Sequence, residues 1–96
     1  MGPSSTLTSQ SRIAIARHQV SCDLADETAI VNLENGVYYG LDTVGTHVWN
    51  RLRQVTTFGE LCDSLIQDYD VEASRLEADM GSFLRELAEQ GLIEIT

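Results

Sequence analysis

Residues 29–42 read AIVNLENGVYYGLD. Two runs of apolar and β-branched residues flank a Glu-Asn-Gly segment, and this arrangement predicts two antiparallel strands joined by a tight turn. A three-residue loop at Glu-Asn-Gly sets Leu33 opposite Val37. It also sets Val31 opposite Tyr39, so the apolar residues of both strands share one face. A two-residue Asn-Gly turn would put them on different faces. We therefore expect the three-residue loop.

A further strand precedes this hairpin. Val20, Cys22 and Leu24 alternate with polar residues from about Arg17 onward, and a period of two is typical of a strand with one buried face. The pattern predicts a three-stranded antiparallel sheet with one apolar face. We expect the two later strands to contribute the following residues to that face: Ala29, Val31, Leu33, Val37, Tyr39 and Leu41.

After the sheet, apolar residues recur every three or four positions, which is the period of a helix. Asp42 or the threonine after it can cap a first helix at about 43–54. Thr57 and Glu60 have the spacing of a capping box. This spacing predicts a second helix at about 58–69.

The last third of the chain predicts a third helix. The helix begins near 72–74 and stops at Gly91, a residue suited to the position just past a helix end. Its apolar stripe consists of Leu76, Met80, Phe83, Leu84 and Leu87. An extended tail, residues 92–95, is a candidate for a final strand. The fold class is therefore α+β, with a three-stranded antiparallel sheet followed by three helices.

The length and the charge of the chain limit the classes of function that it can have. Ninety-six residues make one compact domain, and residues 1–11 are predicted to form a disordered tail before a domain at 12–96. Fifteen acids against six arginines and no lysine give a net charge of −9, and ten of the acids lie at 60–94. Nucleic-acid phosphates need a basic face, so we expect no nucleic-acid partner. No apolar run is long enough for a membrane span, and we expect a soluble, cytoplasmic protein.

The standard catalytic patterns are missing. There is no GxSxG, HExxH or phosphate-binding glycine loop, and neither His18 nor His47 has a partner at a catalytic spacing. Cys22 and Cys62 stand forty residues apart without a CxxC pair, so we expect two buried reduced thiols and no metal site. The sequence predicts a protein that is not an enzyme and has no cofactor.

The last predicted strand, residues 37–41, carries neither charge nor proline. An unpaired edge strand is normally protected by charges or prolines against pairing with other chains. The lack of such protection here favours a strand that binds a partner. An extended peptide could add itself there as another strand, with main-chain hydrogen bonds for affinity. If the third helix flanks this edge, Glu72, Asp79 and Glu86 form an acidic rim for basic peptide residues. Tyr38, opposite the apolar set, is a binding candidate.

These residues resemble the PqqD-like family. Residues 29–42, followed by Val44-Gly45 and Val48-Trp49, look like its central signature. The C-terminal half also resembles the family, in the residues Tyr69-Asp70-Val71, Leu76, Asp79, Phe83, Leu84, Leu87 and Gly91-Leu92-Ile93. The resemblance covers about residues 17–95 in all. The resemblance implies a winged helix-turn-helix-like fold. Where many relatives open the third helix with Asp-Pro, this chain has Glu72-Ala73.

The resemblance also implies a function. Members are recognition elements for ribosomally synthesised, post-translationally modified peptides: they hold the leader of a precursor peptide as an added strand between the third strand and the third helix. They then present it to a modifying or leader-cleaving enzyme. Carried over to this chain, the peptide-binding residues are Val37, Tyr38, Tyr39, Gly40, Leu41, Leu76, Asp79, Met80 and Phe83.

Within the family, a free-standing chain looks most similar to the leader-binding proteins of lasso-peptide biosynthesis, which serve a leader peptidase. The alternatives are a PQQ-type peptide chaperone for a radical-SAM enzyme and, from a different class, a winged-helix transcriptional regulator. The acidic third helix argues against the regulator. We expect a monomer or a weak homodimer.

Overall fold

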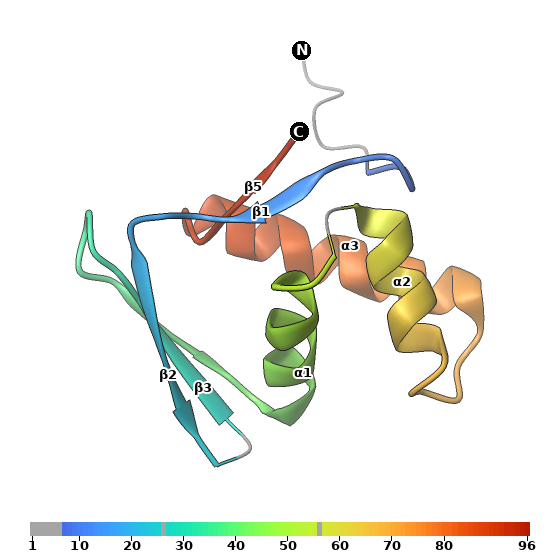
Figure 1. The fold of residues 1–96 in the computed structure, drawn as a ribbon, viewed down its shortest axis with the longest axis horizontal. Helices are drawn as coiled ribbons and strands as arrows, with labels where there is room; N and C mark the ends of the chain where they lie inside the picture. The colour runs from blue at the N-terminus through green and yellow to red at the C-terminus, as the bar shows by residue number, and fades with distance from the viewer. Residues whose placement is uncertain (1–6, 26, 56) are drawn as a thin grey trace.

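The computed structural model describes residues 7–25, 27–55 and 57–96 (Figure 1). Three helices follow a three-stranded antiparallel sheet, so the α+β fold class is confirmed. In chain order the elements are β1 (Ile13–Ile15), β2 (Gln19–Leu24), β3 (Glu27–Asn32), β4 (Tyr38–Leu41), α1 (Thr43–Leu52), α2 (Phe58–Ile66), α3 (Ala73–Glu89) and β5 (Ile93–Ile95).

The order of the main sheet is β2-β3-β4, but the predicted register of its last hairpin is wrong. Val31 pairs with Tyr38, not with Tyr39, and Ile30 pairs with Tyr39. The turn is one residue longer than expected because the Asn32 amide donates to the Val37 carbonyl. A shift of one residue moves every side chain of β4 to the other face relative to β3.

The prediction of the apolar face is therefore right for Tyr39 and Leu41 on β4 but wrong for β2 and β3. The inner face packs against α1 and buries Ile30 and Leu41 at 0% and 4% exposure. The opposite face, called the outer face below, carries the residues predicted for the core: Val20, Cys22, Leu24, Ala29 and Val31, together with Glu27, Tyr38 and Gly40. Leu33 and Val37, near the turn, are also exposed.

A second, two-stranded sheet ties the ends of the chain together. β1 pairs with β5 in antiparallel fashion, with Ile13 opposite Ile95. The candidate final strand is confirmed, whereas β1 was not anticipated. Of the predicted N-terminal tail, residues 1–6 lie outside the described residues. Residues 7–11 lie against α2, where Ser9 and Ser11 accept hydrogen bonds from the first amides of the helix.

The helix starts follow the sequence signals closely. Asp42 caps α1 by accepting from the Gly45 amide at 2.8 Å, and the Thr57–Glu60 capping box of α2 is present in both directions. Helix α3 begins at Ala73, and its N-cap residue, Glu72, makes no side-chain capping hydrogen bond. Both α1 and α2 end earlier than predicted, at Leu52 and Ile66.

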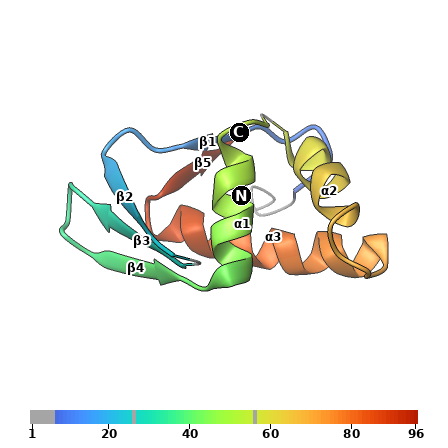
Figure 2. The same cartoon turned by 60° about the horizontal axis from the view of Figure 1, so that its bottom comes forward.

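Helix α1 lies between the main sheet and the α2–α3 pair (Figure 2). It contributes Val48 and Trp49, both fully buried, to a core that reaches from Ile30 to Leu65 and Leu84. Burying such side chains stabilises a fold by about 1.5–3 kcal/mol each. In the part of the chain that the structure describes, no helix has the length and apolar character needed to cross a membrane.

Candidate functional site

Strand β4 is an open edge of the main sheet. Its described neighbour is β3 on one side, and no other described strand pairs with it. Backbone groups of an antiparallel strand point alternately to either side. Because Asn32 bonds to Val37, this alternation directs the backbone N–H and C=O groups of Tyr38 and Gly40 away from β3. These groups can receive a further strand.

A hydrogen bond links β4 to α3 across the fold. The Tyr39 hydroxyl donates to Oε2 of Glu86 at 2.7 Å. Burial first, and then the hydrogen bond to Glu86 and its charge, together raise the pKa of Tyr39 from 10.0 to about 12. The phenol therefore remains protonated at neutral pH and serves as a donor that sets the spacing of β4 and α3.

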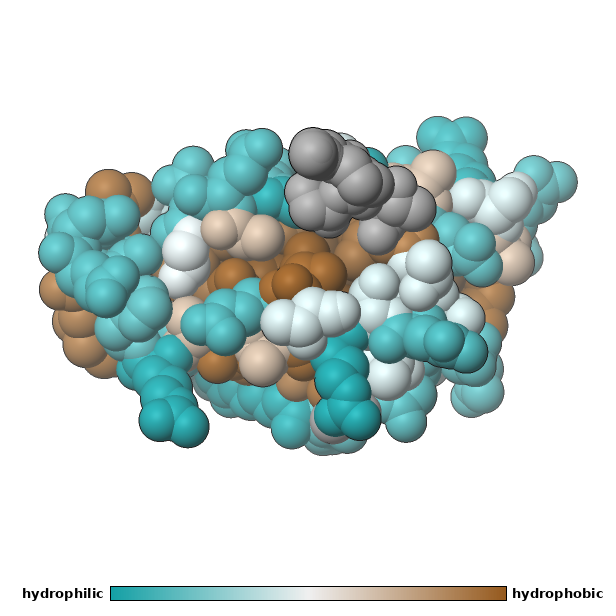
Figure 3. Space-filling view, turned by 90° about the horizontal axis from the view of Figure 1, so that it is seen from above, coloured by the Kyte–Doolittle hydropathy of each residue, from teal (hydrophilic) through white to brown (hydrophobic). Residues whose placement is uncertain are grey.

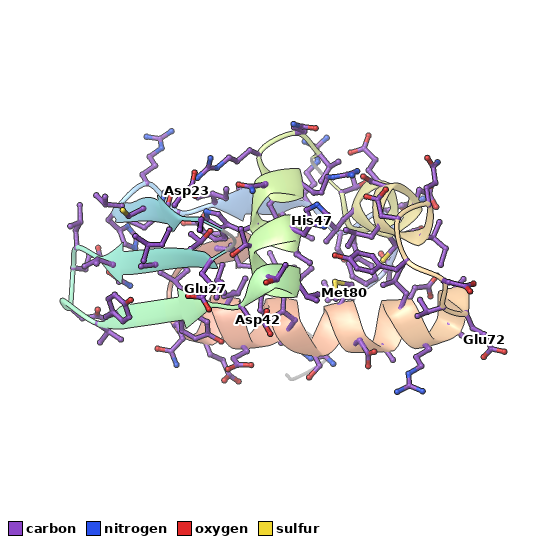
Figure 4. The ribbon with its side chains drawn as sticks, turned by 90° about the horizontal axis from the view of Figure 1, so that it is seen from below. Asp23, Glu27, Asp42, His47, Glu72 and Met80 are labelled. Atoms are coloured by element: carbon purple, nitrogen blue, oxygen red, sulfur yellow. The ribbon has the colours of Figure 1, made fainter. Side chains whose placement is uncertain are left out.

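Two adjoining hollows lie where β4 runs into α1, above α3. One, of about 200 Å³, is lined by Asp42, Val44, Gly45, Val48, Met80 and Phe83. The other, of about 160 Å³, is lined by Val44, Val48, Leu65, Tyr69, Val71, Leu76, Asp79 and Met80. They share three apolar residues, and together with the β4 edge we call them the groove. Figure 4 shows Asp42 and Met80 on either side of the start of α1.

The groove has an acidic rim around an apolar floor. Asp79 lines the hollow of about 160 Å³, whose other lining residues are mostly apolar. Its carboxylate is 3.8 Å from Arg75, and both side chains are largely exposed. An exposed pair at this distance contributes little to stability. Asp42 retains one carboxylate oxygen beyond the one that caps α1. Basic side chains of a bound chain would meet complementary charge there.

The far wall of the groove is fixed by contacts between helices. His47 Nδ1 and the Tyr69 hydroxyl share a hydrogen bond of 2.8 Å, and their rings meet edge to face. Arg51 on α1 forms an ion pair with Asp68 and a hydrogen bond with Ser64. His47 thus has a packing partner that positions Tyr69. No local pattern indicates this pair, because its members lie 22 residues apart.

The structure brings together part of the predicted site. Leu76, Asp79, Met80 and Phe83 all line the groove. From the strand, Gly40 offers backbone groups at the edge, whereas Leu41 is buried in the core and Tyr39 is bonded to Glu86. The Tyr38 side chain lies on the outer face, 64% exposed, and Val37 lies beside the turn.

Several groove residues were missed. Val44 and Val48 were assigned to a helical apolar stripe, and the 47% exposure of Val44 could not be inferred from its position in that stripe. Tyr69 and Val71 lie where α2 was expected to continue or to have just ended. The early end of α2 is what turns both residues toward α1 and α3.

One of the two thiols is buried as predicted and the other is not. Cys62 is buried, as predicted, but Cys22 is exposed on the outer face. Burial first, and then the charges of Glu77 and Asp63, together raise the pKa of Cys62 to about 11. Within the described ranges no three His, Cys, Asp or Glu side chains are grouped closely enough to hold a metal ion.

The fold and groove define a class: a small α+β domain of the winged helix-turn-helix type, with an open sheet edge beside an apolar groove. The chain belongs to the PqqD family, since residues 27–93 match the family model described as coenzyme PQQ synthesis protein D. It is also similar to TbiB1, solved in complex with the TbiA(beta) leader peptide. That match has 34% identity and a TM-score of 0.80, and covers 84% of this chain and 94% of TbiB1. No curated protein sequence matches.

Proposed function

We propose that this protein binds the leader segment of a ribosomally synthesised precursor peptide. The leader adds to β4 as a fourth strand and sends alternate side chains into the groove. The open edge of β4 beside the apolar hollows is the observation that carries the proposal. The similarity to TbiB1, a chain solved with a leader peptide, supports it.

The proposed site consists of the β4 edge and the groove side of α3. The backbone of Tyr38 and Gly40 pairs with the leader, and Leu76, Met80 and Phe83 receive its apolar side chains. Asp79 attracts basic residues. The predicted contacts of Val37, Tyr39 and Leu41 are indirect in this account: they hold the edge strand in place. Strand addition of this kind draws affinity from main-chain hydrogen bonds and specificity from pockets.

The proposed role is presentation without bond-making by this chain. Holding the leader raises the effective concentration of the precursor at a modifying or leader-cleaving enzyme. We place this role in lasso-peptide biosynthesis because of the sequence resemblance to the leader-binding proteins of that pathway. The cytoplasmic location is the expectation from the sequence, which has no apolar run long enough for a membrane span. The description of the family model favours a second candidate, a peptide chaperone in PQQ synthesis.

Fluorescence anisotropy with a labelled leader from the neighbouring precursor gene tests binding, with a scrambled leader as control. Asp79→Lys should weaken binding about tenfold or more, since it reverses a charge beside the apolar pocket. Glu77→Lys is the matched control: it makes the same charge change on the same helix, but Glu77 lines hollows on another side. Equal affinity of both folded variants would remove Asp79 from the site. Absence of leader binding by the folded wild type would refute the proposal.

A further inference from the structure

The outer face of the main sheet is apolar and uncovered. Val20, Leu24 and Tyr38 are 53%, 51% and 64% exposed, and Cys22 beside them is also exposed. Among the strand residues of this face, Glu27 is the one charged side chain. In Figure 3, hydrophobic residues show at the left edge of the molecule, where the sheet lies, behind hydrophilic ones. Soluble proteins rarely leave a contiguous apolar surface exposed to solvent, and such a surface commonly marks an interaction site.

The position of the outer face relates it to the leader. Tyr38 belongs to β4, the strand to which the leader is proposed to add, and its side chain points to the outer face. Side chains of any strand alternate between the two faces of its sheet. A leader strand that sends one set of side chains into the groove therefore places the other set on the outer face, next to Tyr38. The apolar surface and the bound leader become one continuous surface.

Charge narrows the choice of occupant. Glu27 lies at one end of the outer face. Glu34 lies in the turn at the other end, 70% exposed in its side chain, with one carboxylate oxygen 3.3 Å from Nε2 of His18. A second copy of this chain would bring the same two glutamates and its own net charge of −9 to this surface. Like charges facing each other oppose association. The surface suits a partner with an apolar patch bordered by basic residues.

We infer that the outer face is the docking surface for the enzyme that processes the leader-bound precursor. The inference rests on the proposed function, because the bound leader completes the surface that the enzyme contacts. The enzyme then recognises the complex in preference to either the free protein or the free precursor. The groove selects the peptide, and the outer face selects the enzyme.

The test uses two readouts with the purified leader-cleaving enzyme of the same gene cluster. Leader affinity is measured by anisotropy, and the rate of precursor cleavage is measured with and without this protein. The double variant Val20→Ser with Leu24→Ser removes apolar area from the outer face. The double variant Val20→Ile with Leu24→Met keeps it apolar and is the control. Circular dichroism verifies that both are folded.

The serine variant should bind the leader with wild-type affinity and lose about tenfold of the cleavage acceleration, while the apolar control retains it. Wild-type acceleration by the serine variant would overturn the inference. So would a wild-type dimer in sedimentation that the serine variant breaks into monomers without loss of acceleration, because a second copy would then be the occupant. Failure of the wild type to bind the leader would instead refute the proposed function, and with it the basis of the inference.

Discussion

The Tyr39 hydroxyl lies 2.7 Å from Oε2 of Glu86, 47 residues further along the chain. This bond joins β4, the strand whose open edge is proposed to receive the leader, to the helix that lines the groove. A partly exposed hydrogen bond between two elements contributes roughly 0.5–1.5 kcal/mol to stability. Its larger role here is geometric, because it fixes the width of the groove before any peptide arrives.

Tyr39→Phe should lower the free energy of unfolding by about 1 kcal/mol, measured by urea denaturation at pH 7. The wild type should also lose stability between pH 10 and pH 12. The pKa of Tyr39 is raised from 10.0 to about 12 in the folded state, so its stabilising effect is complete below pH 10 and disappears as the pH passes 12. Tyr39→Phe should show a smaller loss over this range. Equal losses in both proteins would contradict the assignment.

Gly91 and Asn32 form a tight contact at the end of α3. Gly91 has a φ of +75°, and a Cβ atom there would lie 2.9 Å from Nδ2 of Asn32, which donates to the Gln90 carbonyl. Gly36 has a similar φ of +73° with open space around it. Gly36→Ala should therefore cost about 1 kcal/mol of backbone strain, and Gly91→Ala clearly more. Comparison of the two unfolding free energies checks this. Similar values would show that Asn32 moves aside freely.

Ala25 carries backbone strain between β2 and β3. Its φ of +57° lies in the left-handed region, which costs alanine about 1–2 kcal/mol and is tolerated better by asparagine. Ala25→Asn should therefore raise the thermal unfolding midpoint. Ala78→Asn, at an exposed position within α3, should lower it because asparagine is the poorer helix former. A lower midpoint for Ala25→Asn would contradict the strained conformation.

The two thiols should react at very different rates. Cys22 is exposed, whereas Cys62 is 7% exposed and has a pKa raised to about 11. At pH 8 roughly one Cys62 in a thousand is a thiolate, the form that attacks disulfide reagents. Ellman's reagent should label the folded protein at one fast site, and Cys22→Ser should remove that phase. Rapid reaction of Cys62 in folded Cys22→Ser would contradict its burial.

The order of strands and helices was predictable because each segment carries a local signal. Asp42, Thr57 and Gly91 mark helix ends through contacts with residues close in sequence. The strand β1 carries no such signal: it is three residues long and is stabilised by β5, about 80 positions later. Its existence depends on tertiary pairing that a local pattern does not encode.

The faces of the sheet were not predictable for a related reason. In β3 the consecutive apolar residues Ala29, Ile30 and Val31 allow either face to be the core face. The choice is made by Asn32, which is buried and bonds with its side chain to the Gln90 carbonyl and the Glu34 amide. A periodicity pattern predicts that a polar residue such as Asn32 is exposed. The Gln90 carbonyl to which its side chain bonds is 58 residues away and is not part of the local pattern. The groove residues on α3 were predictable because an i, i+3, i+4 stripe fixes their shared face.

Addition of the leader to the β4 edge can be measured by amide hydrogen exchange in NMR, with and without saturating leader peptide. The Tyr38 and Gly40 amides, which point to the open edge, should exchange rapidly in the free protein and become strongly protected in the complex. The Tyr39 amide, which the ladder directs toward β3, should change little. Saturable leader binding with unchanged exchange at Tyr38 and Gly40 would contradict strand addition at β4.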